Sequence, residues 1–159
     1  MRVRAAEPSE LVLVTELTER AYARYTDTLG APPIPVTEDY APRIRAGEVW
    51  LLEDGATPLG VLVLKDKGES LEIFSVAVLP ERQGEGIGRR LMTFAEEHAR
   101  RRGRDMLTLF TNAKMVENIE RYRRAGFEES GRRPNPLRPG WTLVDMHKSL
   151  MPSTDSGSA

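Results

Sequence analysis

The segment SLEIFSVAVL, residues 70–79, is apolar on both faces of an extended chain. Among the features of the sequence, this segment limits the possible folds the most. Alternation along a strand places Leu71, Ile73, Ser75, Ala77 and Leu79 on one face and Glu72, Phe74, Val76 and Val78 on the other. Strands of this kind are buried on both sides. We therefore predict a central strand in a sheet that is covered on both faces.

Hydrophobic periodicity and turn residues predict seven strands and four helices along the chain. The expected strands are 1–6, 48–54, 58–66, 70–79, 105–110, 127–133 and 141–150. The expected helices are 9–29, 37–45, 87–102 and 114–126. Prolines at positions 32, 33 and 35 are expected to exclude regular structure before Thr37, the predicted N-cap of the second helix. This order of elements predicts an α/β fold with a sheet of mixed strand direction.

The composition is that of one ordinary globular domain, with 159 residues, 40% of them hydrophobic, and a net charge of -1. We assign residues 1–151 to this domain and expect the tail 152–159 to be disordered. The absence of cysteine excludes disulfides and cysteine chemistry, and no apolar run reaches the roughly 20 residues of a membrane span. We expect a cytoplasmic location, and the near-neutral charge argues against nucleic-acid binding through the overall field.

The segment RQGEGIGRRL, residues 82–91, places three glycines between the apolar strand and the expected start of a helix. Its register fits neither the dinucleotide pattern GxGxxG nor the nucleoside-triphosphate pattern that ends in Gly-Lys-Ser/Thr. The pattern that remains is QxxGxG, formed by Gln83, Gly86 and Gly88. Unpaired N–H groups at a helix N-terminus attract an anion, and glycines let that anion approach the backbone. A tight strand-to-helix turn without a ligand explains the same glycines.

The run LEIFSVAVLPERQGEGIGRRLM, followed about 25 residues later by NIERYRRAGF, resembles the core motifs of the GNAT (Gcn5-related) N-acetyltransferase superfamily. The resemblance extends over about 2–150 in element order, and its specific motifs lie within 72–127. It implies a mostly antiparallel central sheet of about seven strands flanked by four helices. It also implies an enzyme that uses acetyl-CoA and no metal.

The resemblance assigns a cofactor site to two neighbouring segments. The pyrophosphate of coenzyme A would lie against the loop and helix start formed by Gln83, Gly84, Glu85, Gly86, Ile87, Gly88 and Arg89. The pantetheine arm would pair, like an added strand, with the backbone of Val76, Ala77 and Val78.

The resemblance also implies groups that polarise the thioester and accept the amine proton. The backbone N–H of Val76 would donate to the developing negative charge on the carbonyl oxygen. Glu72 would accept the proton, and we expect its face to be shared with Phe74, Val76 and Val78, because apolar surroundings make a carboxylate a better base. A chain of water molecules in place of Glu72 remains an alternative.

Tyr122 stands in the family pattern YxxxGF and would donate a proton to the leaving thiolate. Its place on an apolar helix stripe also fits a core tyrosine with a satisfied hydroxyl. The position of the family's asparagine holds Met115 in this chain. Asn118, on the same helix side as Tyr122, is therefore the candidate for contact with the pantetheine arm, with Asn112 as an alternative or as a helix cap.

The sequence does not identify the acceptor amine. In the family the amine enters over the segment joining the first two helices, here 29–40, and the loop 132–141 is a further candidate wall. The side chains expected on this side are Tyr22, Tyr25, Tyr40 and Trp50, with Asp27, Glu38 and Asp39 as attractants for a cationic amine. The expected partner is a small-molecule or peptide amine, and a homodimer is compatible because family members are often dimers.

Two readings from other functional classes remain open. One is a catalytically weak sensor or partner-docking module that keeps the acyl-CoA cleft. The other, less favoured, is a nucleic-acid-binding domain that uses the clustered arginines.

Overall fold

The computed structural model describes residues 1–151, and the expected disordered tail 152–159 lies outside the described residues. A seven-stranded sheet forms its centre, in the order β1-β2-β3-β4-β5-β7-β6. The strands are β1 (Arg2–Ala5), β2 (Val49–Asp54), β3 (Thr57–Asp66), β4 (Leu71–Val78), β5 (Met106–Asn112), β6 (Glu128–Pro134) and β7 (Thr142–Ser149). Only the β4–β5 pair is parallel. The predicted mixed, mostly antiparallel sheet is therefore confirmed.

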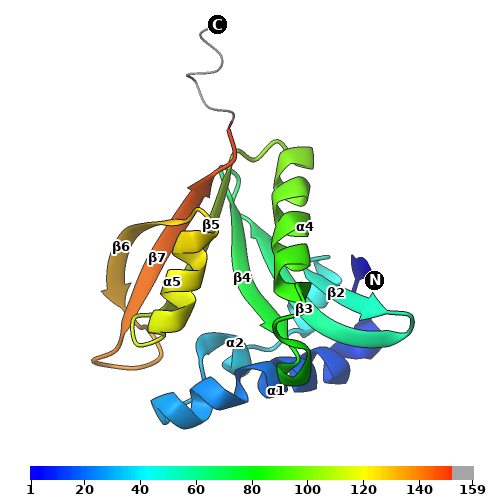
Figure 1. Ribbon diagram of the computed structural model, residues 1–159, viewed down its shortest axis with the longest axis horizontal. Helices are drawn as coiled ribbons and strands as arrows, with labels where there is room; N and C mark the ends of the chain where they lie inside the picture. The colour runs from blue at the N-terminus through cyan, green and yellow to red at the C-terminus, as the bar shows by residue number, and fades with distance from the viewer. Residues whose placement is uncertain (152–159) are drawn as a thin grey trace, which may run out of the picture.

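Within residues 1–151, five α-helices accompany the sheet: α1 (Leu11–Leu29), α2 (Ile34–Thr37), α3 (Ala41–Arg45), α4 (Ile87–Arg101) and α5 (Val116–Arg124). In Figure 1, α4 and α5 lie in front of the sheet and α1 crosses its lower end. A Cβ atom at Gly60 of β3 would come within 3.0 Å of Leu91 Cδ1, so glycine there lets α4 pack closely on the sheet. None of the helices in this part of the chain is long and apolar enough to span a membrane.

The proline-rich segment differs from its prediction. Residues Ile34–Thr37 form the short helix α2, with Pro35 near its N-terminus. Proline is tolerated in a first turn because the N–H that it lacks would be unpaired there. Thr37 ends this helix instead of capping the next one, and its hydroxyl donates to the Ile34 carbonyl at 2.7 Å. The expected single helix 37–45 is thus wrong, and two short helices replace it.

A β-bulge in β4 changes which side chains share a face. Val63 of β3 pairs with Ser75, whereas the next residue, Leu64, pairs with Ile73, so Phe74 is the extra residue in β4. Glu72 pairs with Lys65, but Val76 pairs with Leu62 and Val78 pairs with Gly60. Directly paired residues lie on one face, and residue 65 of β3 faces opposite to residues 62 and 60. The expectation that Glu72 shares a face with Val76 and Val78 is therefore wrong.

Strands β4 and β5 separate after a short contact. They pair only over Leu71–Leu107, Glu72–Thr108 and Ile73–Leu109. Figure 1 shows the two strands diverging towards α1. Beyond Ile73, the edge of β4 that faces β5 has no strand partner, and its backbone groups are open to side chains and ligands.

Candidate functional site

The glycine loop leads from β4 into α4 with two glycines in left-handed backbone conformations. Gly84 has φ 86° and Gly86 has φ 81°, values that only glycine adopts at little cost. Helix α4 begins at Ile87, directly after Gly86. The first N–H groups of the helix have no intrahelical acceptor and carry the positive end of the helix dipole.

A groove of about 760 Å³ runs from this loop along the free edge of β4. Its walls include most of the residues expected at the cofactor site: Val76, Ala77, Val78, Gln83, Gly84, Gly86, Ile87, Gly88, Arg89, Asn118 and Tyr122. Glu85 is the exception, since it lines a separate surface hollow and its carboxylate pairs with Arg82 at 2.9 Å. The structure thus brings the two expected cofactor segments and α5 to one groove.

Gly88 separates the two explanations of the glycine loop. It lies inside α4 without a positive φ, and a Cβ atom there would meet only Val78 Cγ2, at an ordinary 3.9 Å. Glycine in a helix is less favourable than alanine by about 1 kcal/mol. The tight turn accounts for Gly84 and Gly86 but not for Gly88. The absence of a side chain at Gly88 keeps this part of the groove open.

Two side chains mark the direction of the free β4 backbone. The Tyr22 hydroxyl donates to the Val76 carbonyl at 3.2 Å, and Gln83 Nε2 donates to the Val78 carbonyl at 3.2 Å. These carbonyls therefore point away from β3. In a strand, the N–H and C=O of one residue point to the same side. The N–H groups of Val76 and Val78 consequently face the groove, where they can donate to a ligand.

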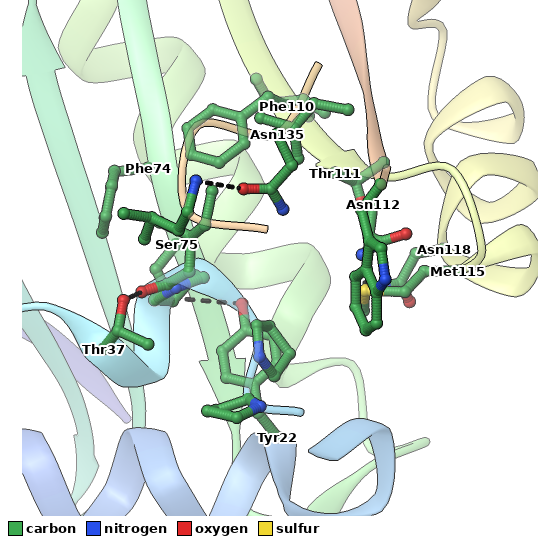
Figure 2. A pocket seen from close by; sticks show the side chains of 18 of the residues that line it. Tyr22, Thr37, Phe74, Ser75, Phe110, Thr111, Asn112, Met115, Asn118 and Asn135 are labelled. Carbon is green, nitrogen blue, oxygen red and sulfur yellow. Dashed lines mark hydrogen bonds between the residues drawn. The ribbon is translucent and has the colours of Figure 1, made fainter. Parts of the chain in front are cut away.

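A second cavity of about 380 Å³ opens between β4, β5, α2 and the β6–β7 loop. Figure 2 shows Phe74 and Ser75 of β4, Phe110 and Thr111 of β5, and Asn135 of the loop around it. It shares four lining residues with the groove: Tyr22, Val76, Asn118 and Tyr122. The two spaces therefore meet at these residues.

The residues expected on the acceptor side are only partly placed there. Tyr22 lines both cavities and Tyr25 lines the groove. Tyr40 is buried and lines neither cavity, although its hydroxyl donates to the carbonyl of the wall residue Pro35. Trp50 packs against Phe94, with ring centroids 4.9 Å apart. The acidic residues Asp27, Glu38 and Asp39 do not line the second cavity.

Several residues that line the second cavity were not named individually in the sequence analysis. These are Ser75, Phe110 and Thr111, together with Asn135, Arg138 and Trp141 of the loop 132–141. Only the loop itself gave a signal, through its prolines. The others come from strand ends that converge only in the folded chain.

Three arginines without a carboxylate partner among residues 1–151 line the groove. Arg89, Arg121 and Arg124 line it and form no ion pair with a carboxylate of residues 1–151. By contrast, the other two basic side chains of its wall are occupied, Arg82 by Glu85 and Lys148 by Glu96. Arg89 in the first turn of α4 and Arg121 and Arg124 in the last turn of α5 together suit a ligand that carries several negative charges.

Residues 14–127 match the family model described as the acetyltransferase (GNAT) family. The chain belongs to the GNAT family. An uncharacterized N-acetyltransferase of Bacillus subtilis (strain 168) is 29% identical to it over 100 residues, which cover 62% of this chain and 63% of that protein. Of the curated relatives that it matches, the chain covers between 16% and 63% of the length.

Solved GNAT-type structures share the fold. The ribosomal-protein-S18-alanine N-acetyltransferase of Escherichia coli has a TM-score of 0.74 at 21% identity, over 96% of this chain and 95% of that chain. A putative acetyltransferase of Salmonella typhimurium, solved with its cofactor acetyl-CoA, has a TM-score of 0.70 at 22% identity, over 96% and 95% of the two chains.

Tyr122 of this GNAT chain lies where the two cavities meet. Burial raises the pKa of its hydroxyl above the ordinary tyrosine value, with Tyr22 nearby as a smaller cause, so the group keeps its proton at neutral pH. No residue of 1–151 forms a hydrogen bond with this hydroxyl. A protonated, unengaged hydroxyl at the junction is free to donate to a ligand.

Asn118 is held one turn before Tyr122. Its side chain is buried, and its Oδ1 accepts hydrogen bonds from the Tyr25 hydroxyl at 3.0 Å and from Arg121 at 3.3 Å. Because Oδ1 is occupied, the Nδ2 group is the free donor. Asn112 does not cap α5, since its Oδ1 accepts the Lys114 N–H at 2.9 Å and the helix begins at Val116.

Glu72 lies outside both cavities. Its side chain is 18% exposed, and its carboxylate is 3.9 Å from Lys67 Nζ. Because of the bulge, it lies on the opposite face of β4 from Val76 and Val78, which line the groove. Glu72 is therefore not one of the residues that form the junction.

Proposed function

We propose that the protein is an N-acetyltransferase that moves an acetyl group from acetyl-CoA to a primary amine by direct attack in a ternary complex. The observation that carries this proposal is the junction of two cavities at Tyr22, Val76, Asn118 and Tyr122. An acyl donor in the groove and an amine in the second cavity would meet there. The acetyl-CoA in the Salmonella typhimurium structure supports this choice of donor.

The groove offers groups for the pyrophosphate and for the pantetheine arm of acetyl-CoA. The N–H groups at the start of α4, together with Arg89, suit a pyrophosphate. The N–H groups of Val76 and Val78 suit the amides of a pantetheine arm that adds as a strand. Arg121 and Arg124 of α5 supply further positive charge.

The reaction forms a C–N bond and breaks a C–S bond, while the amine loses one proton and the departing thiolate gains one. The Val76 N–H is positioned to stabilise the negative charge that develops on the carbonyl oxygen. Tyr122 donates its proton to the sulfur and recovers one from solvent. Asn118 and Tyr22 fix the walls of the junction through their hydrogen bonds to Tyr25 and to the Val76 carbonyl.

Glu72 is proposed to accept the amine proton through bridging water. We expect Glu72→Gln to lower kcat/KM by about tenfold or more and to change its dependence on pH, because a positioned base contributes roughly 100-fold or more when it acts directly. Initial rates measured between pH 6 and pH 9 test this. An unchanged profile assigns the proton to solvent and removes Glu72 from the reaction.

Arg89 and Arg90 are neighbours on α4, but only Arg89 lines the groove. We expect Arg89→Ala to raise the dissociation constant of acetyl-CoA by about tenfold or more, since hydrogen bonds to charged groups contribute about 1.5–3 kcal/mol. Arg90→Ala removes the same charge and should leave the constant nearly unchanged. Equal losses in the two variants, measured by isothermal titration, would mean that net charge alone attracts the ligand.

The proposal as a whole is tested by release of free thiol from acetyl-CoA across a panel of amines. Turnover on at least one amine supports it. Tight binding of acetyl-CoA with no thiol release on any amine indicates the sensor or docking module instead. The cytoplasmic location and the homodimer remain predictions, to be checked by fractionation and by sedimentation.

A further inference from the structure

The residues that line the second cavity indicate which class of acceptor amine could bind there, whereas the reaction chemistry requires only an amine. Among residues 1–151, its walls contain one charged side chain, Arg138, and no aspartate, glutamate or histidine. Of the acidic residues expected here, Glu38 pairs with Arg43 and Asp39 accepts the N–H of Ala41. A polycationic amine would therefore find no opposite charge in this cavity.

Two buried asparagines line the cavity, and the amide nitrogen of each side chain is a hydrogen-bond donor. Asn112 and Asn135 are 8% and 7% exposed. Asn135 Oδ1 accepts the N–H of Leu137 at 2.9 Å, and Asn112 Oδ1 is held in the same way by the N–H of Lys114. Turning either amide over would set N–H against N–H, so the carboxamide orientation is fixed.

The nitrogen of each carboxamide has no acceptor among residues 1–151. Figure 2 shows the Asn135 oxygen engaged and its nitrogen on the other side, with Asn112 at a different part of the wall. Trp50 Nε1 is the one enclosed side-chain nitrogen or oxygen without a partner among residues 1–151, so the two asparagine nitrogens are open to the cavity and can donate to a ligand there.

Arg138 adds an unpaired cation to the same wall. The β6–β7 loop that carries it is closed by hydrogen bonds from the Asn135 N–H to the Trp141 carbonyl at 2.8 Å and from the Trp141 N–H to the Arg138 carbonyl at 3.1 Å. The guanidinium has no carboxylate partner within residues 1–151, and it lies 5.8 Å from the centre of the Trp141 ring. A fixed loop thus presents a guanidinium and an amide donor together.

The rest of the wall is apolar. Phe110, Met115, Leu137 and Trp141 line it, and Phe110 also stacks edge-on against Phe74 at 5.8 Å between ring centroids. A volume of about 380 Å³ is that of a small ligand site. The cavity therefore combines an anion-binding end with room for one apolar group.

We infer that the acceptor is an amine that carries a carboxylate and an apolar side chain, as a free aromatic amino acid does. This inference rests on the proposed function and names the substrate class of the same site. The carboxylate accepts hydrogen bonds from Arg138 and Asn135, and the side chain packs on Phe110 and Trp141. The amino group is then directed to the junction at Tyr22 and Tyr122.

The test compares L-phenylalanine with phenethylamine, which lacks only the carboxylate, and with the polycation spermidine. We expect kcat/KM for phenylalanine to exceed that for phenethylamine by about 100-fold or more, because a site built to bind an anionic group rejects an analogue without it. Titration of phenylalanine into the protein saturated with coenzyme A should show binding where phenethylamine shows none. Equal or better turnover of phenethylamine or spermidine overturns the inference and leaves the proposed function standing.

Two variants test which residues cause the preference for phenylalanine over phenethylamine. Arg138→Met should raise KM for phenylalanine about tenfold or more and leave KM for phenethylamine nearly unchanged. Asn135→Asp keeps the acceptor for the Leu137 N–H but replaces the inward donor by an oxygen, so it should lower the phenylalanine-to-phenethylamine ratio as well. The control Arg132→Met removes an exposed arginine of β6 that pairs with Glu129 outside the cavity. If the control alters the ratio as much as Arg138→Met does, the loop is not the binding end.

Discussion

Replacing Tyr122 by phenylalanine should lower kcat by about 100-fold or more and leave the dissociation constant of acetyl-CoA almost unchanged. The magnitude is that of a positioned general acid. The hydroxyl keeps its proton because burial raises its pKa, and it forms no hydrogen bond with residues 1–151. Its loss therefore removes a proton donor without breaking a structural contact. Steady-state rates and isothermal titration of acetyl-CoA measure the two quantities.

Tyr40→Phe provides the matched control. Tyr40 is 1% exposed, its hydroxyl donates to the Pro35 carbonyl, and it lines neither cavity. This variant should lose about 1 kcal/mol of stability, the usual contribution of a buried hydrogen bond, and keep its kcat. Tyr122→Phe should show the opposite pattern in thermal unfolding and rate. A Tyr122→Phe protein with full turnover removes the acid role from this residue.

The parts of the site that follow from local sequence were predictable. The apolar run 70–79 identified β4 as a buried central strand, and the glycines after it identified the start of α4. Both signals depend on neighbours within a few positions. The same holds for α5, where the spacing of Asn118 and Tyr122 predicted that the two side chains face one way, and both line the junction.

The bulge at Phe74 was not predictable, because it is a property of the pairing between β3 and β4. Strict alternation along β4 is the default for any strand, and nothing in the run LEIFSVAV marks an extra residue. One inserted residue is enough to reverse the faces on either side of it. This is why the sequence placed Glu72 with Val76 and Val78, whereas the fold separates them.

The charge of the second cavity was not predictable for a related reason. The sequence alone suggests that the carboxylates of Glu38 and Asp39 are free to attract a cation. In the fold, Glu38 accepts a hydrogen bond from Arg43, and Asp39 accepts one from the Ala41 N–H. Asn135 lies far from β4 in sequence, and only the return of the β6–β7 loop brings it to the cavity wall. The sequence shows that a carboxylate is present but not whether a nearby arginine or backbone N–H already engages it.

Gly88→Ala should have opposite effects on the empty protein and on its complex. A methyl group at this position meets only Val78 Cγ2 at 3.9 Å, and alanine favours the helix, so the free protein should gain up to about 1 kcal/mol in stability. The same methyl group projects into the groove, where overpacking typically costs about 1–3 kcal/mol. We therefore expect the dissociation constant of acetyl-CoA to rise about tenfold or more.

Gly131→Ala separates this effect from glycine replacement in general. Gly131 lies in β6, has no atom within 4 Å of an added Cβ, and lines neither cavity. It should leave acetyl-CoA binding unchanged in the same titration. If Gly88→Ala binds acetyl-CoA as tightly as the native chain, the ligand does not approach the first turn of α4. The glycine loop would then be a turn and nothing more, and the unpaired arginines would have to hold the anion elsewhere along the groove.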